Sequence, residues 1–215
     1  TILMYKILNL YCGLGGNRKL WQNCKVTAIE NNKEIAKLYQ TYYPQDTVIV
    51  GDAHKYLLEH ISEHFDLIWS STPCPTHSQL KIAAVFSGRG TNKPVYPDMR
   101  LYQEIILLKY FANRKTKWVV ENVDPYYSTL IKPQVIINRH CFWSNFYIPK
   151  RNFKEENKVE FIEGGAVHYG FDLRNEEIKS IKKRVLLRNL VNPEIGLYIL
   201  QESLKRKTPL FNFNY

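Results

Sequence analysis

The stretch that decides the fold is Leu10-Tyr11-Cys12-Gly13-Leu14-Gly15-Gly16, which follows an apolar run beginning at Tyr5. Glycine allows a tight turn and a close approach of a ligand to the main chain, and the amides at the start of a following helix attract anions. The stretch therefore predicts the first strand and turn of a nucleotide-binding α/β sheet. A dinucleotide fingerprint needs a further glycine where Arg18 stands, so NAD is a poor match. A tight turn without any ligand is the alternative for this motif taken alone.

Short apolar runs alternate with helical patterns through the first half of the chain. We expect strands at residues 5–11, 26–30, 47–50, 65–70 and 118–120, and helices at residues 33–42 and 98–111. The apolar runs are nearly continuous, as expected of parallel strands that helices cover on both faces. The pattern predicts a doubly wound, Rossmann-like sheet. A basic helical pattern at 176–188 and an apolar run at 195–200 follow.

Acidic residues close two of the expected strands. Glu30 ends the second strand and Asp52 follows the third. At the carboxyl edge of a doubly wound sheet, such a carboxylate accepts hydrogen bonds from a ribose diol. Each carboxylate could instead cap the following helix. Their common edge with the glycine turn favours a nucleotide-like ligand.

A cysteine between two prolines follows the fourth expected strand, in Pro73-Cys74-Pro75. The prolines restrict the backbone of Cys74, as suits a nucleophile that has to be held in position. A thiol attacks as the thiolate, so positive charge or backbone donors are needed nearby. Glu121 follows the fifth strand and would lie beside this loop as an acid. His77 is more simply a residue of a polar loop than a catalyst, and no metal site is expected.

These motifs resemble those of the cytosine carbon-5 methyltransferase family, which includes bacterial and phage DNA methylases and a related tRNA enzyme. The glycine turn is similar to the family's first motif, with Tyr11 where phenylalanine is usual. Pro73-Cys74 is similar to its nucleophile motif and Glu121-Asn122-Val123 to its catalytic glutamate motif. Residues 188–193 resemble the final motif, which folds back against the glycine turn and completes the cofactor pocket.

The resemblance implies methyl transfer from S-adenosylmethionine to carbon 5 of cytosine in DNA, with S-adenosylhomocysteine as the product. It implies that Cys74 adds to carbon 6 of the base while Glu121 holds or protonates ring nitrogen 3. The catalytic residues that it implies are Cys74, Glu121 and Arg139. The cofactor contacts that it implies are Tyr11, Cys12, Gly13, Leu14, Gly15, Gly16, Glu30, Asn31, Asp52, Ala53, Pro73, Asn189 and Val191.

The sequence departs from the family pattern in two local positions. Pro75 follows the nucleophile where bacterial members usually carry glutamine. Residues 138–141 lie where the family offers two alternating arginines, and only Arg139 remains. If Cys141 occupies the place of the catalytic arginine, the charge that develops in the transition state is less well stabilised, unless Arg139 or His140 substitutes.

The region that would recognise a target DNA sequence is short in this chain. Related DNA enzymes insert a recognition domain where this chain has only the connection 146–163. Specificity should then be very short, absent or supplied by a partner subunit. Because the target base has to leave a stacked duplex or be single-stranded, the loop 76–97 is the expected lid. Basic residues that could contact phosphates are Lys81, Arg89 and Lys93 in this loop, and those of 150–158 and 179–188.

Composition bounds the remaining classes. A chain of 215 residues, 45% hydrophobic, predicts a single domain over 1–215. The net charge of +10 favours a nucleic-acid partner. With no long apolar run and four widely spaced cysteines, we expect a soluble cytoplasmic protein of a bacterial or phage-infected cell, for example from a restriction-modification system. The alternatives are an RNA (tRNA) cytosine methyltransferase, and a subunit or homodimer that depends on a partner chain.

Overall fold

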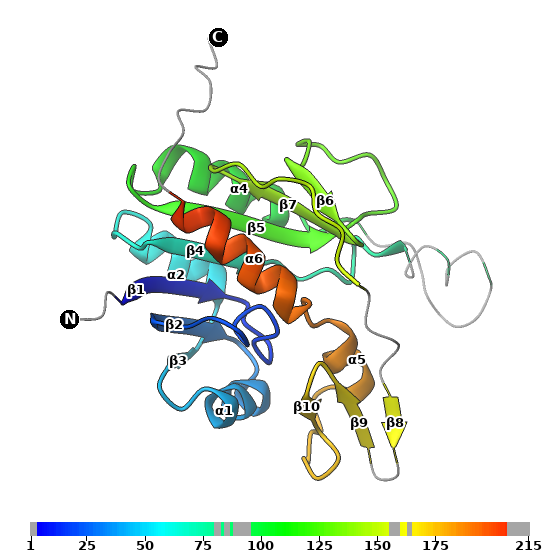
Figure 1. Ribbon diagram of the computed structural model, residues 1–215. Coiled ribbons are helices and arrows are strands. Elements are labelled where there is room, and N and C mark those ends of the chain that lie inside the picture. The colour runs from blue at the N-terminus through cyan, green and yellow to red at the C-terminus, as the bar shows by residue number, and fades with distance from the viewer. Residues whose placement is uncertain are drawn as a thin grey trace.

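The computed structural model describes residues 4–79, 83, 87, 96–154, 160–162 and 165–205 (Figure 1). Its centre is a seven-stranded sheet with the strand order β3-β2-β1-β4-β5-β7-β6. The strands are β1 (Tyr5–Leu10), β2 (Cys24–Glu30), β3 (Thr47–Val50), β4 (Leu67–Ser71), β5 (Lys117–Val123), β6 (Val135–Ile137) and β7 (His140–Ser144). β1 to β5 run parallel, and β7 is antiparallel to both β5 and β6. The expected doubly wound sheet is confirmed.

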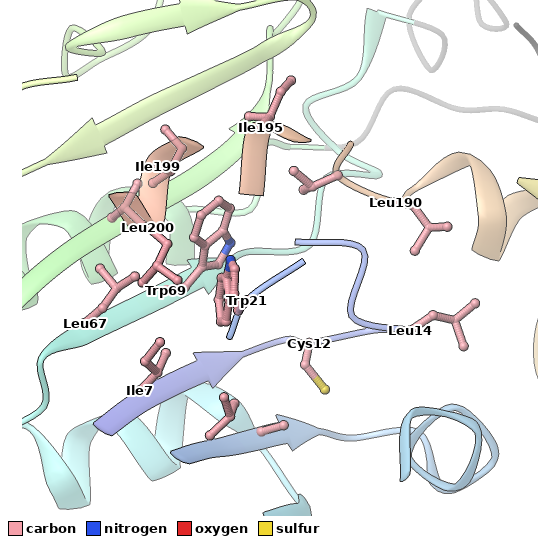
Figure 2. Close-up of a cluster of buried hydrophobic side chains, with 14 of the residues drawn as sticks. Ile7, Cys12, Leu14, Trp21, Leu67, Trp69, Leu190, Ile195, Ile199 and Leu200 are labelled. Atoms are coloured by element: carbon pink, nitrogen blue, oxygen red, sulfur yellow. The ribbon is translucent and has the colours of Figure 1, made fainter. Parts of the chain in front are cut away.

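Helices cover both faces of this sheet, as continuous apolar strands require. The helices α1 (Lys33–Tyr42) and α6 (Pro193–Leu204) pack on one face, and α2 (Ala53–His60) and α4 (Arg100–Phe111) pack on the other. Figure 2 shows the first of these cores, where Trp21 and Trp69 lie against Ile195 and Ile199 of α6. The two indole centroids are 5.8 Å apart. Within the described residues, none of the helices has the length and apolarity to cross a membrane.

The strand order reverses between β1 and β4, and this places a crevice at the carboxyl ends of the strands. From β1 the chain proceeds outward to β2 and β3, whereas β4 starts on the other side of β1 and continues to β5. The loops that leave β1 and β4 therefore diverge and leave a space between them. In this sheet the two loops are the glycine turn and the segment with Cys74.

The C-terminal part differs most from expectation. The pattern at 176–188 predicts one helix, but α5 spans only Lys183–Arg188. The carboxylate of Glu34 accepts hydrogen bonds from the backbone amides of Lys179 and Ser180, which holds that stretch in a turn. The expected plain connection at 146–163 also ends in a strand. β8 (Glu160–Ile162), β9 (Gly165–His168) and β10 (Phe171–Asp172) form a small antiparallel sheet near α5 (Figure 1). The lid residues Lys81, Arg89 and Lys93, and residues 155–159, lie outside the described residues.

Candidate active site

A cavity of about 330 Å³ opens at the point where the strand order reverses. Its walls come from the glycine turn, the ends of β2, β4 and β5, the start of β7, and the segment that follows α5. The expected site residues that line it are Tyr11, Cys12, Gly13, Leu14, Gly16, Glu30, Asn31, Pro73, Cys74, Glu121, Arg139, Asn189 and Val191. The structure thus brings thirteen of the sixteen expected residues to one cavity, and the exceptions are Gly15, Asp52 and Ala53.

The glycine turn is held by the carboxylate of Glu30. Gly13 and Gly15 have φ angles of +53° and +77°, which glycine adopts without strain. One Glu30 oxygen accepts a hydrogen bond from the amide of Gly13 at 3.1 Å, and the other accepts from the amide of Asn32 at 2.9 Å. Burial raises the pKa of Glu30, while these amides oppose the shift. The carboxylate therefore joins the turn to the start of α1 at the edge of the cavity.

The three expected residues that do not line the cavity are Gly15, Asp52 and Ala53, and each has close contacts within the fold. A side chain at Gly15 would begin 2.6 Å from the ring of Tyr43 and 2.7 Å from that of Tyr39. Asp52 caps α2, accepting hydrogen bonds from the amides of His54 and Lys55, and these bonds lower its pKa. Ala53 is buried in the core beneath α2. For Asp52 the geometry agrees with the helix-capping alternative.

The C-terminal segment closes the cavity from the other side. A side-chain carbon at Gly16 would lie 2.5 Å from the carbonyl oxygen of Val191 and 3.1 Å from the side chain of Leu190. The indole of Trp21 donates to the carbonyl of Gly196 at 3.0 Å. The segment expected to fold back against the glycine turn does so. Close backbone contact at Gly16 is what couples the two parts of the pocket.

We predict that Gly16→Ala weakens binding of S-adenosylmethionine, the cofactor that the sequence resemblance implies, because the new methyl group has to displace the backbone at Val191. Overpacking of this kind costs about 1–3 kcal/mol. If the cofactor-bound state alone carries this cost, the affinity falls roughly 5- to 150-fold. Isothermal titration calorimetry with the cofactor measures the effect. Gly51→Ala is the matched control, since a side chain there meets no atom within 4 Å. Equal affinities for the two variants would contradict the coupling.

Cys74 is held at the mouth of the loop after β4 by contacts on both sides. The side-chain amide of Asn122 donates to the carbonyl and the hydroxyl of Thr72, at 3.0 and 2.9 Å. The amides of His77 and Ser78 donate to the carbonyl of Cys74, so a turn begins at the cysteine. These bonds fix the backbone that carries the thiol relative to β5.

The charge around Cys74 is mixed. Burial, and next the carboxylate of Glu121, raise the pKa of the Cys74 thiol to about 11, while Arg139 and Arg188 lower it. A free thiol without ligands is therefore largely protonated at neutral pH. The two arginines and any cationic ligand favour the thiolate.

His77 contributes to the loop rather than to the chemistry. Its ring is fully buried, and its Nδ1 lies 2.6 Å from the hydroxyl of Tyr127. Burial lowers the pKa of His77, which favours the neutral ring. The sequence predicts a simple loop residue here, and the contact with Tyr127 makes it an anchor of that loop.

The residue beside Glu121 is His140. Its Nδ1 lies 2.6 Å from Oε1 of Glu121, and both side chains are buried. Cys141 instead points to the opposite face of the sheet, into the core beneath α4. The hypothesis that Cys141 takes the place of the catalytic arginine is therefore wrong, because neighbouring residues of a strand face opposite sides. The pairing of β5 with β7 places His140 in contact with Glu121, and no hydrogen bond joins Arg139 to Glu121 within the described residues.

Arg139 lies at the rim of the cavity. It precedes β7, is exposed, and donates through its guanidinium to the carbonyl of Arg188 at 2.7 Å. This bond joins the β7 side of the site to the segment that follows α5. Arg139 therefore contributes positive charge near Cys74. The hydrogen-bond partner of Glu121 is His140.

One buried carboxylate, on the face of the sheet that α4 covers, belongs to none of the motifs found in the sequence. Glu104 of α4 is fully buried and accepts hydrogen bonds from the hydroxyls of Tyr11 and Ser70. Its Oε1 lies 3.2 Å from Nδ1 of His54. Burial and Glu104 raise the pKa of Tyr11 strongly. The hydroxyl of Tyr11 thus supplies Glu104 with a hydrogen-bond donor, which a phenylalanine at this position would lack.

We predict that Glu104→Ala lowers the free energy of unfolding by about 1–3 kcal/mol for each buried hydroxyl left unsatisfied. Urea denaturation followed by circular dichroism measures this loss. Glu104→Gln is the control, because its amide oxygen still accepts from one hydroxyl, and it should lose less. A larger loss for glutamine than for alanine would show that the hydroxyls do not depend on Glu104.

The sheet order, the cavity at its switch point and the glycine turn define the class of the protein: a Rossmann-like, S-adenosylmethionine-dependent methyltransferase. The chain belongs to the C-5 cytosine-specific DNA methylase family, whose profile matches residues 5–124, more than half of the chain. S-adenosylmethionine is the cofactor of this family. A search of curated protein sequences finds no match.

Solved structures resemble the fold at low sequence identity. A SAM-dependent methyltransferase from Agrobacterium tumefaciens is 17% identical, with a TM-score of 0.39, and the match covers 58% of this chain and 40% of that one. A TehB-like SAM-dependent methyltransferase from Corynebacterium glutamicum is 17% identical, with a TM-score of 0.36 and 55% of each chain covered. A SAM-dependent methyltransferase from Archaeoglobus fulgidus is 17% identical, with a TM-score of 0.39, and the match covers 57% of this chain and 46% of that one. The chain thus spans about half of these proteins or less.

Proposed function

We propose that this protein transfers a methyl group from S-adenosylmethionine to carbon 5 of cytosine in DNA, through a covalent bond between Cys74 and the base. The observation that carries the proposal is the meeting of Cys74 and Glu121 in the cavity that the glycine turn and Glu30 also line. A nucleophile, an acid and a nucleotide-like pocket therefore share one space. Membership of the C-5 cytosine-specific DNA methylase family supports the choice of base and position.

The residues around the cavity suit the cofactor. Gly13 leaves open space on its side-chain side, so a ligand can approach the main chain. In this proposal Glu30 accepts hydrogen bonds from the ribose hydroxyls, and the apolar side chains of Leu14 and Ile35 border the same space. The bound cofactor supplies an electrophilic methyl group on a sulfonium. Its positive charge would also favour the thiolate form of Cys74.

The residues of the chain then act on cytosine in a fixed order. The Cys74 thiolate forms a bond to carbon 6 as Glu121 gives a proton to ring nitrogen 3, which makes carbon 5 nucleophilic. Carbon 5 takes the methyl group, whose bond to sulfur breaks, and S-adenosylhomocysteine is the second product. Carbon 5 then loses its proton to a base, the bond from carbon 6 to sulfur breaks, and the proton on nitrogen 3 returns to Glu121. The thiolate and the acid are both regenerated, and one proton is released for each methyl group transferred.

The target base has to leave a stacked duplex for this chemistry, or be presented in a single strand. Positive charge near the cavity suits the backbone of such a substrate, since Arg139, Arg188 and the basic turn before α5 lie on one side of it. Phosphate contacts of this kind position a nucleic acid but do not read its sequence.

The test is the transfer of labelled methyl from S-adenosylmethionine to mixed-sequence duplex DNA, single-stranded DNA and tRNA. Label on cytosine carbon 5 in DNA, located by nucleoside mass spectrometry, is the expected result. Label on tRNA alone would replace the DNA proposal with an RNA cytosine methyltransferase. Cofactor binding without transfer to any substrate would indicate a subunit that needs a partner chain.

We predict that Glu30→Ala weakens cofactor binding, because it removes the carboxylate that the proposal gives to the ribose and that holds Gly13. Hydrogen bonds to a charged group contribute about 1.5–3 kcal/mol, so the dissociation constant should rise roughly 10- to 150-fold. Asp52→Ala is the matched control, because Asp52 also closes a strand but does not line the cavity. Calorimetry distinguishes the two, and an equal loss in both variants would return Asp52 to the cofactor site.

A further inference from the structure

We propose that His140 is a positioning residue that holds the buried carboxyl group of Glu121 through a hydrogen bond, so that methyl transfer by this protein depends on the imidazole beside Glu121. This inference rests on the proposed function and adds to it a role for His140, which the sequence left open. It is carried by the contact between the two side chains and by the register of the strands that bear them.

The pairing of β5 with β7 brings the two side chains together. In this antiparallel pair Glu121 lies opposite Phe142, and Val123 lies opposite His140. Glu121 and His140 therefore project from the same face of the sheet on a diagonal, within reach of one another. Nδ1 and Oε1 are 2.6 Å apart, and the side chains are 8% and 7% exposed.

A buried carboxylate needs a partner. An ionised carboxylate without one is costly in an apolar environment, whereas a pair that shares one proton is neutral overall. With that proton on His140 the pair consists of a carboxylate and an imidazolium, and with the proton on Glu121 it consists of a carboxylic acid and a neutral ring. The two forms differ only in the position of one proton along a short hydrogen bond. Glu121 can therefore give a proton to ring nitrogen 3 and receive it again from the base at the end of the cycle.

The other charged and titrating groups near the pair come from each neighbouring element. Cys74 lies on the loop after β4, and Arg139 and Arg188 lie at the rim on the side of α5. Asp124 follows β5, where its side chain approaches Cys141 on the opposite face of β7. If the pair loses its shared proton, the site gains one negative charge. That charge opposes formation of the Cys74 thiolate and leaves no proton for nitrogen 3.

Histidine differs here from the arginine that such a site could carry. A guanidinium stays charged at any pH at which the protein is folded, whereas an imidazole changes its charge near neutrality. An imidazole beside Glu121 can therefore donate or accept the proton of the hydrogen bond. An arginine at this position would only donate and would keep its positive charge.

The first test does not depend on catalysis. Alkylation of Cys74 by iodoacetamide is followed against pH, by mass spectrometry of the Cys74 peptide, in the wild type, His140→Gln and His140→Arg. A positive charge next to a carboxylate favours the nearby thiolate, so at pH 7 we expect alkylation about tenfold slower in His140→Gln and at least as fast as wild type in His140→Arg. Slow alkylation of Cys12, Cys24 and Cys141, which are buried, shows that each variant is folded. Equal rates at Cys74 in all three proteins would overturn the proposal.

The second test is the pH profile of kcat for methyl transfer in the same proteins. The expected result is a lower kcat in His140→Gln across the whole profile, and a ratio of the His140→Arg rate to the wild-type rate that changes with pH. Identical profiles would overturn the role of His140, because a residue that only fills space would not move them. If the wild type transfers no methyl group to cytosine, the proposed function fails, while the alkylation rates still decide whether His140 sets the charge at Glu121.

Discussion

Replacing Cys74 with alanine is expected to abolish methyl transfer, by at least roughly 10⁴-fold in kcat, while cofactor binding remains. Alanine has no atom that can form the bond to carbon 6, so carbon 5 is never activated. Cys74 lines the cavity beside Glu121, and its backbone is fixed by the amides of His77 and Ser78, so the substitution removes the sulfur without disturbing the turn. Labelled-methyl transfer measures the rate, and calorimetry measures the binding of S-adenosylmethionine.

Cys24→Ala is the control, because it removes a cysteine that lies outside the cavity. This variant should keep a kcat close to that of the wild type, because it loses only a sulfur atom in the core. DNA that carries 5-fluorocytosine offers a second measurement, since carbon 5 then has no proton to lose and the bond to Cys74 should persist. A stable protein–DNA adduct in the wild type, absent from Cys74→Ala, is the expected result. Residual methyl transfer in the alanine variant would show that another group attacks the base.

The same thiol sets the sign of a pH effect. Because burial and Glu121 raise the pKa of Cys74 to about 11, the fraction of thiolate in the free protein increases with pH throughout the neutral range. Alkylation of Cys74 in the free protein should therefore accelerate by about tenfold per pH unit between pH 7 and 9. Addition of the cationic cofactor should shift this profile toward lower pH. A rate that does not vary with pH would mean that the thiolate is already formed.

Replacing Asp46 with alanine should lower the free energy of unfolding by about 3–5 kcal/mol, since it leaves a buried guanidinium without its partner. Two Asp46 oxygens accept from Arg18, at 2.8 and 3.0 Å, and the side chains are 4% and 0% exposed. The hydroxyl of Tyr39 donates to the same carboxylate at 2.8 Å. This network ties the segment after the glycine turn to the end of α1. Urea denaturation measures the loss.

The control for Asp46→Ala is the double variant Arg18→Met with Asp46→Leu, which replaces both charges by apolar side chains of similar size. Such replacements are often neutral for buried pairs, so the double variant should recover most of the stability. A double variant as unstable as Asp46→Ala would mean that shape, and not the unpaired charge, causes the loss. Arg18 occupies the position where a dinucleotide fingerprint has glycine, and its side chain is buried there beside Asp46.

Much of the fold follows from local pattern. The helix predicted at 33–42 is found as Lys33–Tyr42, with Asn32 as its cap, and the strand predicted at 47–50 is found as Thr47–Val50. These elements are short-range: an apolar stripe, a capping amide and a run of β-branched residues suffice. The helix predicted at 176–188 is shorter because Glu34, distant in sequence, binds the backbone amides of that stretch.

The expected active-site residues divide in the same way. The motifs around Gly13, Cys74 and Glu121 could be read along the chain, because each combines a strand end with a residue whose chemistry needs such a place. Asp52 could not be assigned in this way, since a carboxylate at a strand end serves equally well as a helix cap. The distinction depends on whether the side chain reaches the cavity.

The sequence was therefore sufficient for the class of fold and for the cysteine, glutamate and glycine motifs, because these depend on periodicity and on residues close together in the chain. The partner of Glu121 was settled only by the tertiary structure. Whether Arg139, His140 or Cys141 meets that carboxylate depends on the register between β5 and β7, and a shift of one residue would turn each side chain to the other face. The buried partners of Tyr11 and Arg18 likewise come from α4 and the turn after α1, which no local pattern brings together.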